Sequence, residues 1–151
     1  MTEIENAVRL IENLYTVERI ITAMEKEPKC YGTDELLYAN EVHTLKMIAQ
    51  FRGITQKELT EKMFRTKGAT SIMIKKLEKK GFITRQEDEM DARILRLYLT
   101  DKGKMVNELH LKYDEDKITQ WMEDLKFSDE EVITTNQVLE VFTDFVSKNI
   151  L

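Results

Sequence analysis

Residues 55–103, TQKELTEKMFRTKGATSIMIKKLEKKGFITRQEDEMDARILRLYLTDKG, contain the pattern that decides the fold of this chain. The stretch predicts two short helices followed by a polar-tipped hairpin. Thr55 with Glu58 three residues later is typical of a capping box at a helix start, and Thr66 is the next N-cap candidate. Gly81 ends the second helix, since glycine readily takes the left-handed conformation found just past a helix end.

Two strands are expected after Gly81, at 82–87 and 94–99, because β-branched and aromatic residues are frequent there. In the second strand every other residue from Leu95 to Leu99 is a leucine, which is typical of a half-buried strand. Residues 88–93 are polar enough to form the tip. The order helix, basic helix and hairpin predicts a winged helix-turn-helix, a mainly α fold with a small β-hairpin wing (α+β).

Charge is distributed unevenly along the chain, whose formal net charge is -5. Residues 52–104 carry 14 Lys and Arg against 8 Asp and Glu, a balance of +6. The remaining residues carry 9 against 20, a balance of -11. A basic block in an acidic chain indicates a localised surface for an anionic partner such as DNA, because the acidic remainder repels DNA elsewhere.

Helices are also predicted on both sides of the basic block. Apolar residues recur at helical spacing over 4–24 and again over 40–51, where Val42, Leu45, Ile48 and Ala49 are expected on one face. A long helix follows Thr100, and a last helix begins at a second capping-box pattern, Ser128 with Glu131, and continues its apolar stripe to Ile150. We predict a helical dimerisation region at 1–39 and 104–151 around a DNA-binding domain at 40–103.

The 151-residue length is about that of one domain, although two fused subdomains are also compatible with it. No apolar run is long enough to span a membrane, and the acidic N-terminus differs from a signal peptide. The single cysteine, Cys30, cannot form an internal disulfide. These features predict a cytoplasmic protein that does not insert in membranes.

The helix over 66–80 has the properties of a helix that enters the major groove of DNA. Such a helix packs on one face and presents donors and small residues on the other. A solvated lysine-rich helix is the alternative interpretation, and the hairpin favours DNA because its tip places Arg93 where a guanidinium can enter a narrow minor groove. The candidate DNA-binding residues are Thr66, Lys67, Gly68, Ser71, Lys75, Lys76 and Arg93.

Several segments resemble the MarR family of bacterial transcription factors. LEKKGFI at 77–83 is similar to the end of that family's recognition helix, and DAR at 91–93 followed by LTDKG at 99–103 is similar to its wing signature. The segment ITQKELTEKM at 54–63 resembles the supporting helix. The turn after that helix often carries Gly and then an apolar residue in the family, whereas Phe64 and Arg65 stand there in this chain.

The resemblance implies a homodimer built from interlocked N- and C-terminal helices, in which each winged helix reads half of a pseudopalindromic DNA operator. It also implies a small aromatic or lipophilic effector that binds between the dimerisation helices and the winged helix. Each candidate wall residue has core or hinge packing as its alternative role. The candidates are Tyr15, Tyr31, Tyr38, His43 and Met47.

Catalysis, cofactors and resident metals are not expected. The chain has no Gly-rich phosphate loop, nucleophile elbow or H-E-x-x-H pattern. Cys30, His43 and His110 are far apart in sequence, so they do not predict a metal site. The sequence therefore predicts a ligand-responsive transcription regulator, most simply a repressor. The alternatives are a protein-interaction module on a winged-helix scaffold and a DNA-binding regulator without an effector.

Overall fold

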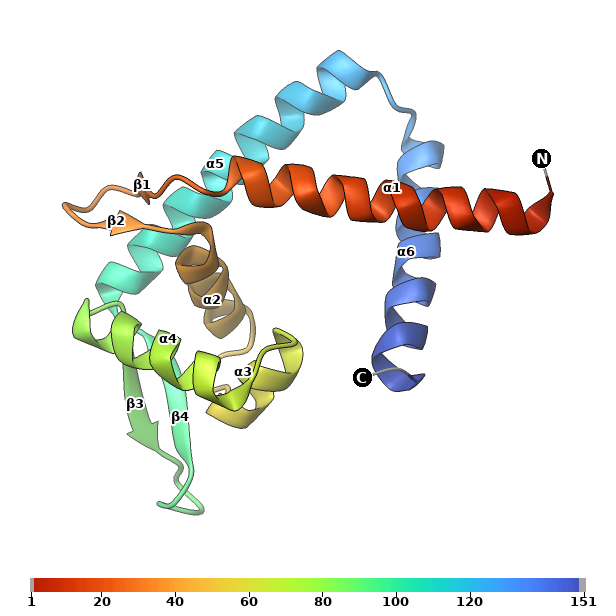
Figure 1. Ribbon diagram of the computed structural model, residues 1–151. Helices are drawn as coiled ribbons and strands as arrows, with labels where there is room; N and C mark the ends of the chain where they lie inside the picture. Colours follow the sequence, from red (N-terminus) through yellow and green to blue (C-terminus); the bar gives the residue numbers. More distant parts are fainter. Residues whose placement is uncertain (1, 150–151) are drawn as a thin grey trace. The chain divides into compact units, whose positions relative to one another are not determined.

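The computed structural model describes residues 2–149 and contains six helices and two small antiparallel hairpins in that range (Figure 1). Contacts between Cα atoms divide it into two units, one ending at Leu111 and one starting at Lys112. The elements in order are α1 (Glu3–Met24), β1 (Lys29–Cys30), β2 (Leu36–Leu37), α2 (Ala39–Gln50), α3 (Gln56–Lys62), α4 (Lys67–Lys79), β3 (Ile83–Glu87), β4 (Leu95–Leu99), α5 (Asp101–Leu125) and α6 (Asp129–Asn149).

The predicted fold class is confirmed, and every predicted helix and strand has a counterpart among the described residues. The pair β1 and β2 was not predicted; it forms where the sequence indicated only a break between helices. Both expected capping boxes are present. The backbone amide of Glu58 donates to Oγ1 of Thr55 at 3.3 Å, and that of Glu131 donates to Oγ of Ser128 at 3.3 Å.

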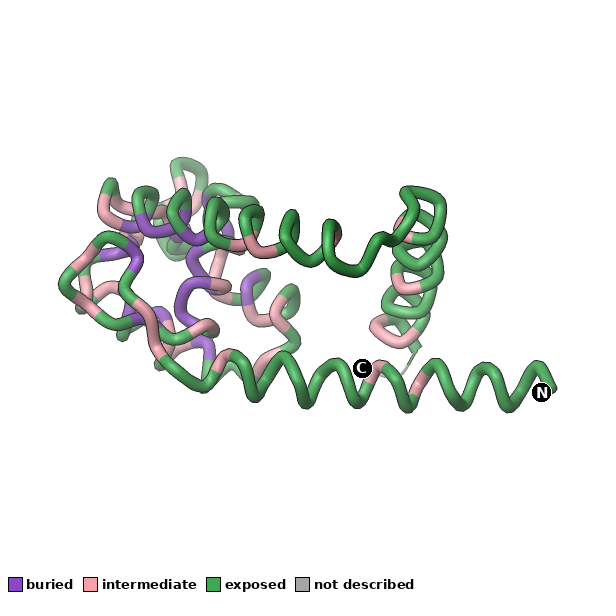
Figure 2. The backbone as a smooth tube through the Cα atoms, turned by 90° about the horizontal axis from the view of Figure 1, so that it is seen from above, coloured by how far each residue is buried: buried purple, intermediate pink, exposed green. Residues whose placement is uncertain are grey.

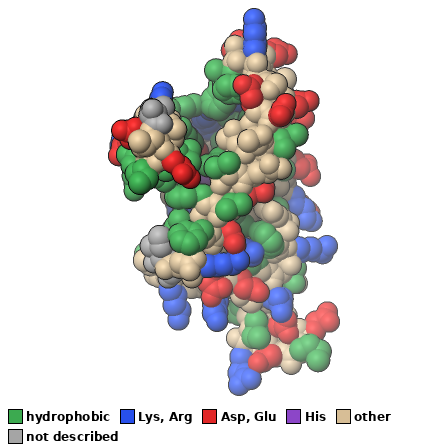
Figure 3. Space-filling model, turned by 90° about the vertical axis from the view of Figure 1, so that its right-hand side faces the viewer, with side chains coloured by type: hydrophobic (Ala, Val, Ile, Leu, Met, Phe, Trp, Pro, Cys, Tyr) green, Lys and Arg blue, Asp and Glu red, His purple; other side chains and the backbone are tan. Residues whose placement is uncertain are grey.

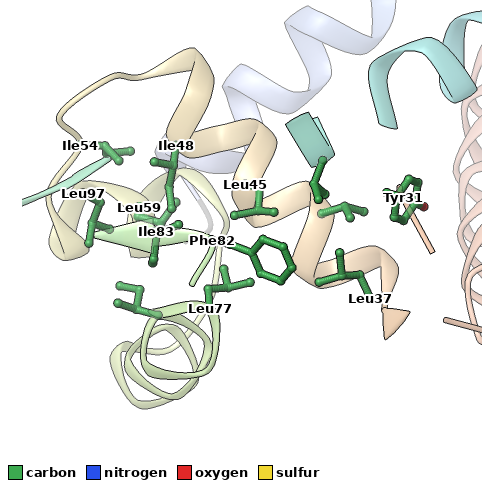
Figure 4. Packing of buried hydrophobic residues seen from close by; sticks show 13 residues of the cluster. Tyr31, Leu37, Leu45, Ile48, Ile54, Leu59, Leu77, Phe82, Ile83 and Leu97 are labelled. Atoms are coloured by element: carbon green, nitrogen blue, oxygen red, sulfur yellow. The ribbon is translucent and has the colours of Figure 1, made fainter. Parts of the chain in front are cut away.

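One hydrophobic core lies in the first unit, where α2, α3, α4 and the β3–β4 hairpin meet (Figure 4). Helix α4 contributes Ile74 and Leu77, both fully buried, which is the inward face expected from helical spacing. The largest completely buried side chain of the core is that of Phe82, just before β3 of the wing. The other core residues are Tyr31, Leu37, Val42, Leu45, Ile48, Ile54, Leu59, Ile83, Leu97 and Val106.

The inward face of α2 differs from the prediction at two positions. Ala49 is exposed and lines a surface cavity of about 790 Å³ instead of packing in the core, so that prediction was wrong. Glu41, a charged residue, is completely buried in α2. Helical spacing puts Glu41 beside Leu45 and Ile48, and lysines from α4 compensate its charge, as described below.

The wing is a regular antiparallel pair in which Ile83 lies opposite Leu99 and Glu87 opposite Leu95. A short third segment joins it, because the amide of Leu97 donates to the carbonyl of Ile54 at 2.9 Å. Ile54 precedes α3, so this bond attaches the hairpin to the supporting helix. The wing is thereby held by both the core and the backbone next to α3.

Helices α1 and α6 bury none of their described residues, and their tubes are mostly green in Figure 2, whereas the buried residues (purple) lie between Tyr31 and His110. The predicted apolar stripes are therefore only partly covered in the single chain: Val8 of α1 is 55% exposed and Phe142 of α6 is 37% exposed. The expected last stripe residue, Ile150, lies outside the described residues. Within residues 2–149 no helix combines the length and apolar character needed to cross a membrane.

Candidate nucleic-acid interface

Helix α4 is anchored at its start by Thr66, the predicted N-cap. Oγ1 of Thr66 accepts a hydrogen bond from the amide of Ala69 at 3.2 Å. This bond satisfies one of the free amides of the first turn. Because Thr70, Ile74 and Leu77 are buried on the inner face, the helix presents the opposite face to solvent. The seven exposed residues are Lys67, Gly68, Ala69, Ile72, Lys75, Lys76 and Lys79.

The end of α4 is a Schellman motif. Gly81 has φ of +76°, its amide donates to the carbonyl of Glu78 at 2.9 Å, and the amide of Phe82 donates to the carbonyl of Leu77 at 3.0 Å. Leu77 and Phe82 are both completely buried, which supplies the apolar contact that accompanies this motif. The KKGFI segment thus turns the chain from the basic helix directly into the wing.

The LTDKG segment connects that turn to α5. Oγ1 of Thr100 donates to the carbonyl of Gly81 at 2.6 Å and accepts from the amide of Gly103 at 3.1 Å. The amide of Thr100 also donates to the carbonyl of Phe82 at 3.0 Å. A Cβ atom on Gly103 would overlap that carbonyl, so glycine is required for α5 to approach this closely. The segments 77–83 and 99–103, both of which resemble MarR-family motifs, therefore contact each other where α4, the wing and α5 meet.

Two ion pairs set the direction of the wing. Glu78 at the end of α4 accepts two hydrogen bonds from Arg85 of β3, at 2.8 Å from Nε and 2.6 Å from Nη2. Arg96 of β4 pairs with Asp88, and its Nη1 donates to the carbonyl of Gly53 at 2.9 Å. The Arg96 bond lowers the pKa of the Asp88 carboxyl. The wing is therefore fixed to both α4 and the loop that precedes α3.

Arg93 belongs to the loop between β3 and β4, which forms the wing tip at the bottom of Figure 1. Its side chain is 90% exposed. Its guanidinium donates to Asp91 from Nε at 2.9 Å and from Nη2 at 2.8 Å. The Arg93 hydrogen bond lowers the pKa of Asp91, so that carboxyl stays ionised. Asp91 orients the arginine without covering it, because a guanidinium has five donors and this pair uses two.

The lysines of α4 and of its C-cap, Lys80, fall into two groups. Nζ of Lys80 donates to the buried Glu41 at 2.7 Å and to the carbonyl of Leu36 at 3.1 Å, and Nζ of Lys76 lies 3.3 Å from the same carboxylate. Lys67, Lys75 and Lys79 have no ion pair among the described residues and remain exposed. The candidates Lys67 and Lys75 are thus available to a phosphate, whereas Lys76 shares its charge with Glu41.

Glu41 stays charged although it is buried. Burial raises its pKa, but the hydrogen bond from Lys80, the backbone amide of Tyr38 and the charges of Lys80 and Lys76 lower it more, so the net shift is downward. The amide of Tyr38 donates to Oε2 of Glu41 at 3.0 Å. One carboxylate thereby caps α2 and holds the C-terminal end of α4. No pattern in the sequence predicts this pair, because its residues are 39 positions apart.

The turn between α3 and α4 contains Phe64 with φ of +49°, a left-handed conformation that bulky residues rarely adopt. In the family that the sequence resembles, glycine often stands at this position. Phe64 is 62% exposed, and Arg65 is directed inward, where Nη1 donates to Oγ1 of Thr44 at 3.1 Å. Burial lowers the pKa of Arg65. The turn keeps its geometry without glycine, at the cost of a strained backbone.

Beside the wing is a groove of about 250 Å³ that includes three basic side chains from different elements. Lys57 belongs to α3, Arg85 to β3 and Arg93 to the tip. Sequence analysis identified only Arg93, because charge counts cannot show which cations share a surface. Figure 3 shows Lys and Arg side chains (blue) projecting from the lower part of one face, with acidic groups (red) among them.

The structure brings together only some of the residues expected to bind an effector. The rings of Tyr31 and His110 are 5.5 Å apart edge to face, and those of His43 and His110 are 5.3 Å apart. Nε2 of His43 lies 3.7 Å from Glu25. Met47 packs against the core, Tyr15 on α1 is 57% exposed, and Tyr38 is 46% exposed next to Lys76.

From the sequence, His110 was weighed only as a weak candidate metal ligand. In the structure it is buried beside Tyr31 and His43. No signal short of the three-dimensional arrangement indicates this grouping. Within residues 2–149 no three His, Cys, Asp or Glu side chains are placed to share a metal ion. Cys30 is exposed.

Residues 37–95 match the model of the MarR family. The HTH-type transcriptional regulator SarZ of Staphylococcus epidermidis is 30% identical over 93 residues, which are 62% of this chain and 58% of SarZ. SarZ of Staphylococcus aureus is 33% identical over 72 residues, 48% of each chain. The matched part of this chain therefore spans only about half the length of these curated relatives.

Two solved structures show the same fold along nearly the whole chain. FabT of Streptococcus pneumoniae, crystallised in complex with DNA, has a TM-score of 0.74 and 24% identity, over 94% of this chain and 98% of FabT. The transcriptional regulator BldR from Sulfolobus solfataricus also has a TM-score of 0.74, with 22% identity, over 93% of this chain and 99% of BldR.

Proposed function

We propose that this chain is a member of the MarR family, binds duplex DNA as a homodimer and regulates transcription. The observation that carries the proposal is the outer face of α4, where Lys67, Lys75 and Lys79 are exposed beside small residues while the inner face is packed in the core. A basic helix supported in this way fits the major groove. The similarity to FabT, which was crystallised with DNA, supports the same interpretation.

In the proposed complex, Lys67, Ser71 and Lys75 face the major groove and Arg93 faces the minor groove. Thr66 and Gly68 are at the helix end where the backbone can approach DNA, and Lys76 contacts phosphate. Nothing lies within 4 Å of a Cβ built on Gly68, so this end is open. Ser71 is only half exposed, and its hydroxyl group is the part that would contact DNA. The DNA-binding domain comprises residues 40–103.

The homodimer is supported by the uncovered apolar residues of the terminal helices. Ile4 is 76% exposed on α1, and Phe145 and Val141 are 59% and 72% exposed on α6. Large apolar side chains left exposed along a helix mark a site of association, and a second copy of the chain offers the same surfaces in return. Residues 1–39 and 104–151 are therefore assigned to dimerisation.

The proposed regulator is a cytoplasmic, non-enzymatic repressor that blocks a promoter sterically. A small aromatic or lipophilic effector would release it by binding near Tyr15, Tyr31, Tyr38, His43 and Met47. The packing of the Tyr31 and His43 rings on His110 supports this location, because it provides aromatic surface next to α2. Effector binding and the identity of the effector are separate questions from DNA binding.

An electrophoretic shift experiment with the DNA upstream of the chain's own gene tests the proposal. We expect sequence-dependent binding whose affinity falls steeply with salt, since each neutralised phosphate contributes about -0.9 to the slope of log affinity against log salt. Sedimentation of the free protein should give a dimer. Absence of duplex binding at low salt would refute DNA binding and favour the alternative, a protein-interaction module on a winged-helix scaffold.

The effector is tested separately by thermal melting with a panel of phenolic acids and fatty acyl compounds. A compound that binds only the folded state raises the melting temperature. The same compound should weaken the DNA complex. If no compound has either effect while DNA binding persists, the chain is a regulator without an effector.

A further inference from the structure

Ile72 is the only large apolar side chain that α4, which is described along its whole length, leaves largely exposed; it is 70% accessible. Most other exposed apolar residues are on α1, α5 and α6, in the region assigned to dimerisation. At helical spacing Ile72 is instead next to Gly68, Lys75 and Lys76. An apolar side chain is thus placed at the centre of a basic face.

Apart from Lys67 and Ser71, the N-terminal half of that face carries no side chain that can hydrogen-bond to a base edge. Ala69 is exposed and has only a methyl group, and Gly68 has no side chain. Ile72 itself has no hydrogen-bond donor or acceptor. Sequence recognition by this part of α4 can therefore combine hydrogen bonds from Lys67 and Ser71 with an apolar contact from Ile72.

We propose that Ile72 reads sequence by van der Waals contact with the 5-methyl group of thymine in the major groove. This inference rests on the proposed function. The thymine methyl group is the apolar feature that distinguishes base pairs in the major groove, and alkyl side chains are its usual partners. The surrounding lysines bring the helix to the phosphates, so Ile72 is held against the base edges between them.

The size of the effect follows from the area removed from water. One methyl group buried against an aliphatic side chain is worth about fourfold in affinity, and cytosine, which lacks it, is disfavoured by at least that factor. The same contact removes the exposed surface of Ile72 from water. We therefore expect a thymine at a fixed position of each operator half-site.

The test replaces thymine by deoxyuridine, which removes only the methyl group. Duplexes that bind the protein are first selected from a random pool, and each thymine is then replaced in turn. The affinity of each duplex is measured for the unmodified protein, for Ile72→Ala and for Leu36→Ala. Leu36 is a matched control, because it is also exposed, at 55%, but belongs to β2.

For the unmodified protein and Leu36→Ala, one replacement per half-site should weaken binding about fourfold. For Ile72→Ala the same replacement should have no effect, and Ile72→Thr, which keeps one methyl group, should give an intermediate loss. Melting of each variant confirms that it is folded. Equal sensitivity in Ile72→Ala, or no sensitive thymine at all, would overturn the inference. Failure of the unmodified protein to bind any duplex would refute the proposed function as well.

Discussion

Three glycines of the winged helix are expected to respond differently to alanine, because the structure needs each for a different reason. Gly103 lies against the Phe82 carbonyl, and a Cβ there would overlap the oxygen and lie 3.0 Å from the carbonyl carbon. Gly81 has open space around it but a φ of +76°. Gly68 has open space and a conformation that any residue can adopt. The three substitutions therefore separate steric overlap, backbone strain and intrinsic helix propensity.

We expect the largest loss of folding stability for Gly103→Ala. The overlapping atom is backbone, and it is held by the hydrogen bond from Thr100 at 3.0 Å, so it cannot simply move away. Overpacking of this kind costs about 3 kcal/mol, and the better helix propensity of alanine returns about 1, so we expect a net loss of about 2 kcal/mol.

Gly81→Ala should be milder. A left-handed alanine costs about 1–2 kcal/mol, and the lower entropy of the unfolded chain offsets about half of that, which leaves a loss of about 1 kcal/mol. Gly68→Ala should raise stability, by up to about 1 kcal/mol. In the proposed complex its new methyl group would stand between helix and DNA, so this variant should melt higher and bind DNA less tightly.

Urea and thermal unfolding followed by circular dichroism measure these differences. For a chain of this length each kcal/mol corresponds to about 2–4 °C in melting temperature, so Gly103→Ala should melt about 4–8 °C lower. Protein concentration must be held constant, because the proposed dimer would make the melting temperature depend on it. A Gly103→Ala protein as stable as the unmodified protein, or less affected than Gly81→Ala, would refute the proposed close approach.

Three further predictions concern the interface and its support. Arg93→Ala should weaken DNA binding by about tenfold and reduce the salt slope by about 1 in a titration over several salt concentrations, with unchanged melting because the side chain is exposed; unchanged affinity would remove Arg93 from the interface. Glu41→Gln should cost about 2 kcal/mol in urea unfolding at pH 7, since it leaves the half-buried Lys80 without its carboxylate. The pKa of Glu41 is lower in the folded state than the value near 4.5 in the unfolded state, so the stability that its carboxylate contributes is complete above pH 4.5 and is lost as pH falls through the folded-state pKa. The unmodified protein and Glu41→Gln should therefore converge in stability in acid. A constant difference in stability across that pH range would contradict the role given to the Glu41 charge. Phe64→Gly should stabilise the chain by about 1 kcal/mol in the same assay by relieving the positive φ, and a loss of stability would show that the exposed ring contributes more than the strain costs.

The sequence predicted the elements of this fold well because local signals define them. Thr55 with Glu58 and Ser128 with Glu131 are capping pairs within one helical turn, and Gly81 marks a helix end through its own backbone freedom. Such features need no knowledge of distant residues. The small β1–β2 hairpin was missed because each strand has only two residues, too few for a periodic pattern.

The candidate site was predictable only in part, since exposure depends on tertiary packing. Helical spacing indicated the inner face of α4, but it did not distinguish Lys80, which bonds to Glu41, from Lys75, which has no ion pair among the described residues. It also gave no reason to notice Ile72, because an isoleucine in a helix is usually part of the core. Its 70% exposure is known only from the fold.

The sequence by itself determined that this chain is a mainly helical winged helix-turn-helix with a basic block between acidic helices. Those properties follow from residue order, spacing and charge, which act over a few residues. The tertiary structure decided that the segments 77–83 and 99–103 contact each other. The hydroxyl of Thr100 donates to the carbonyl of Gly81, and Gly103 packs on Phe82. It decided likewise that Glu41 is neutralised by lysines of α4. Contacts between residues about 20 to 40 positions apart depend on how the helices pack, and no local pattern specifies that.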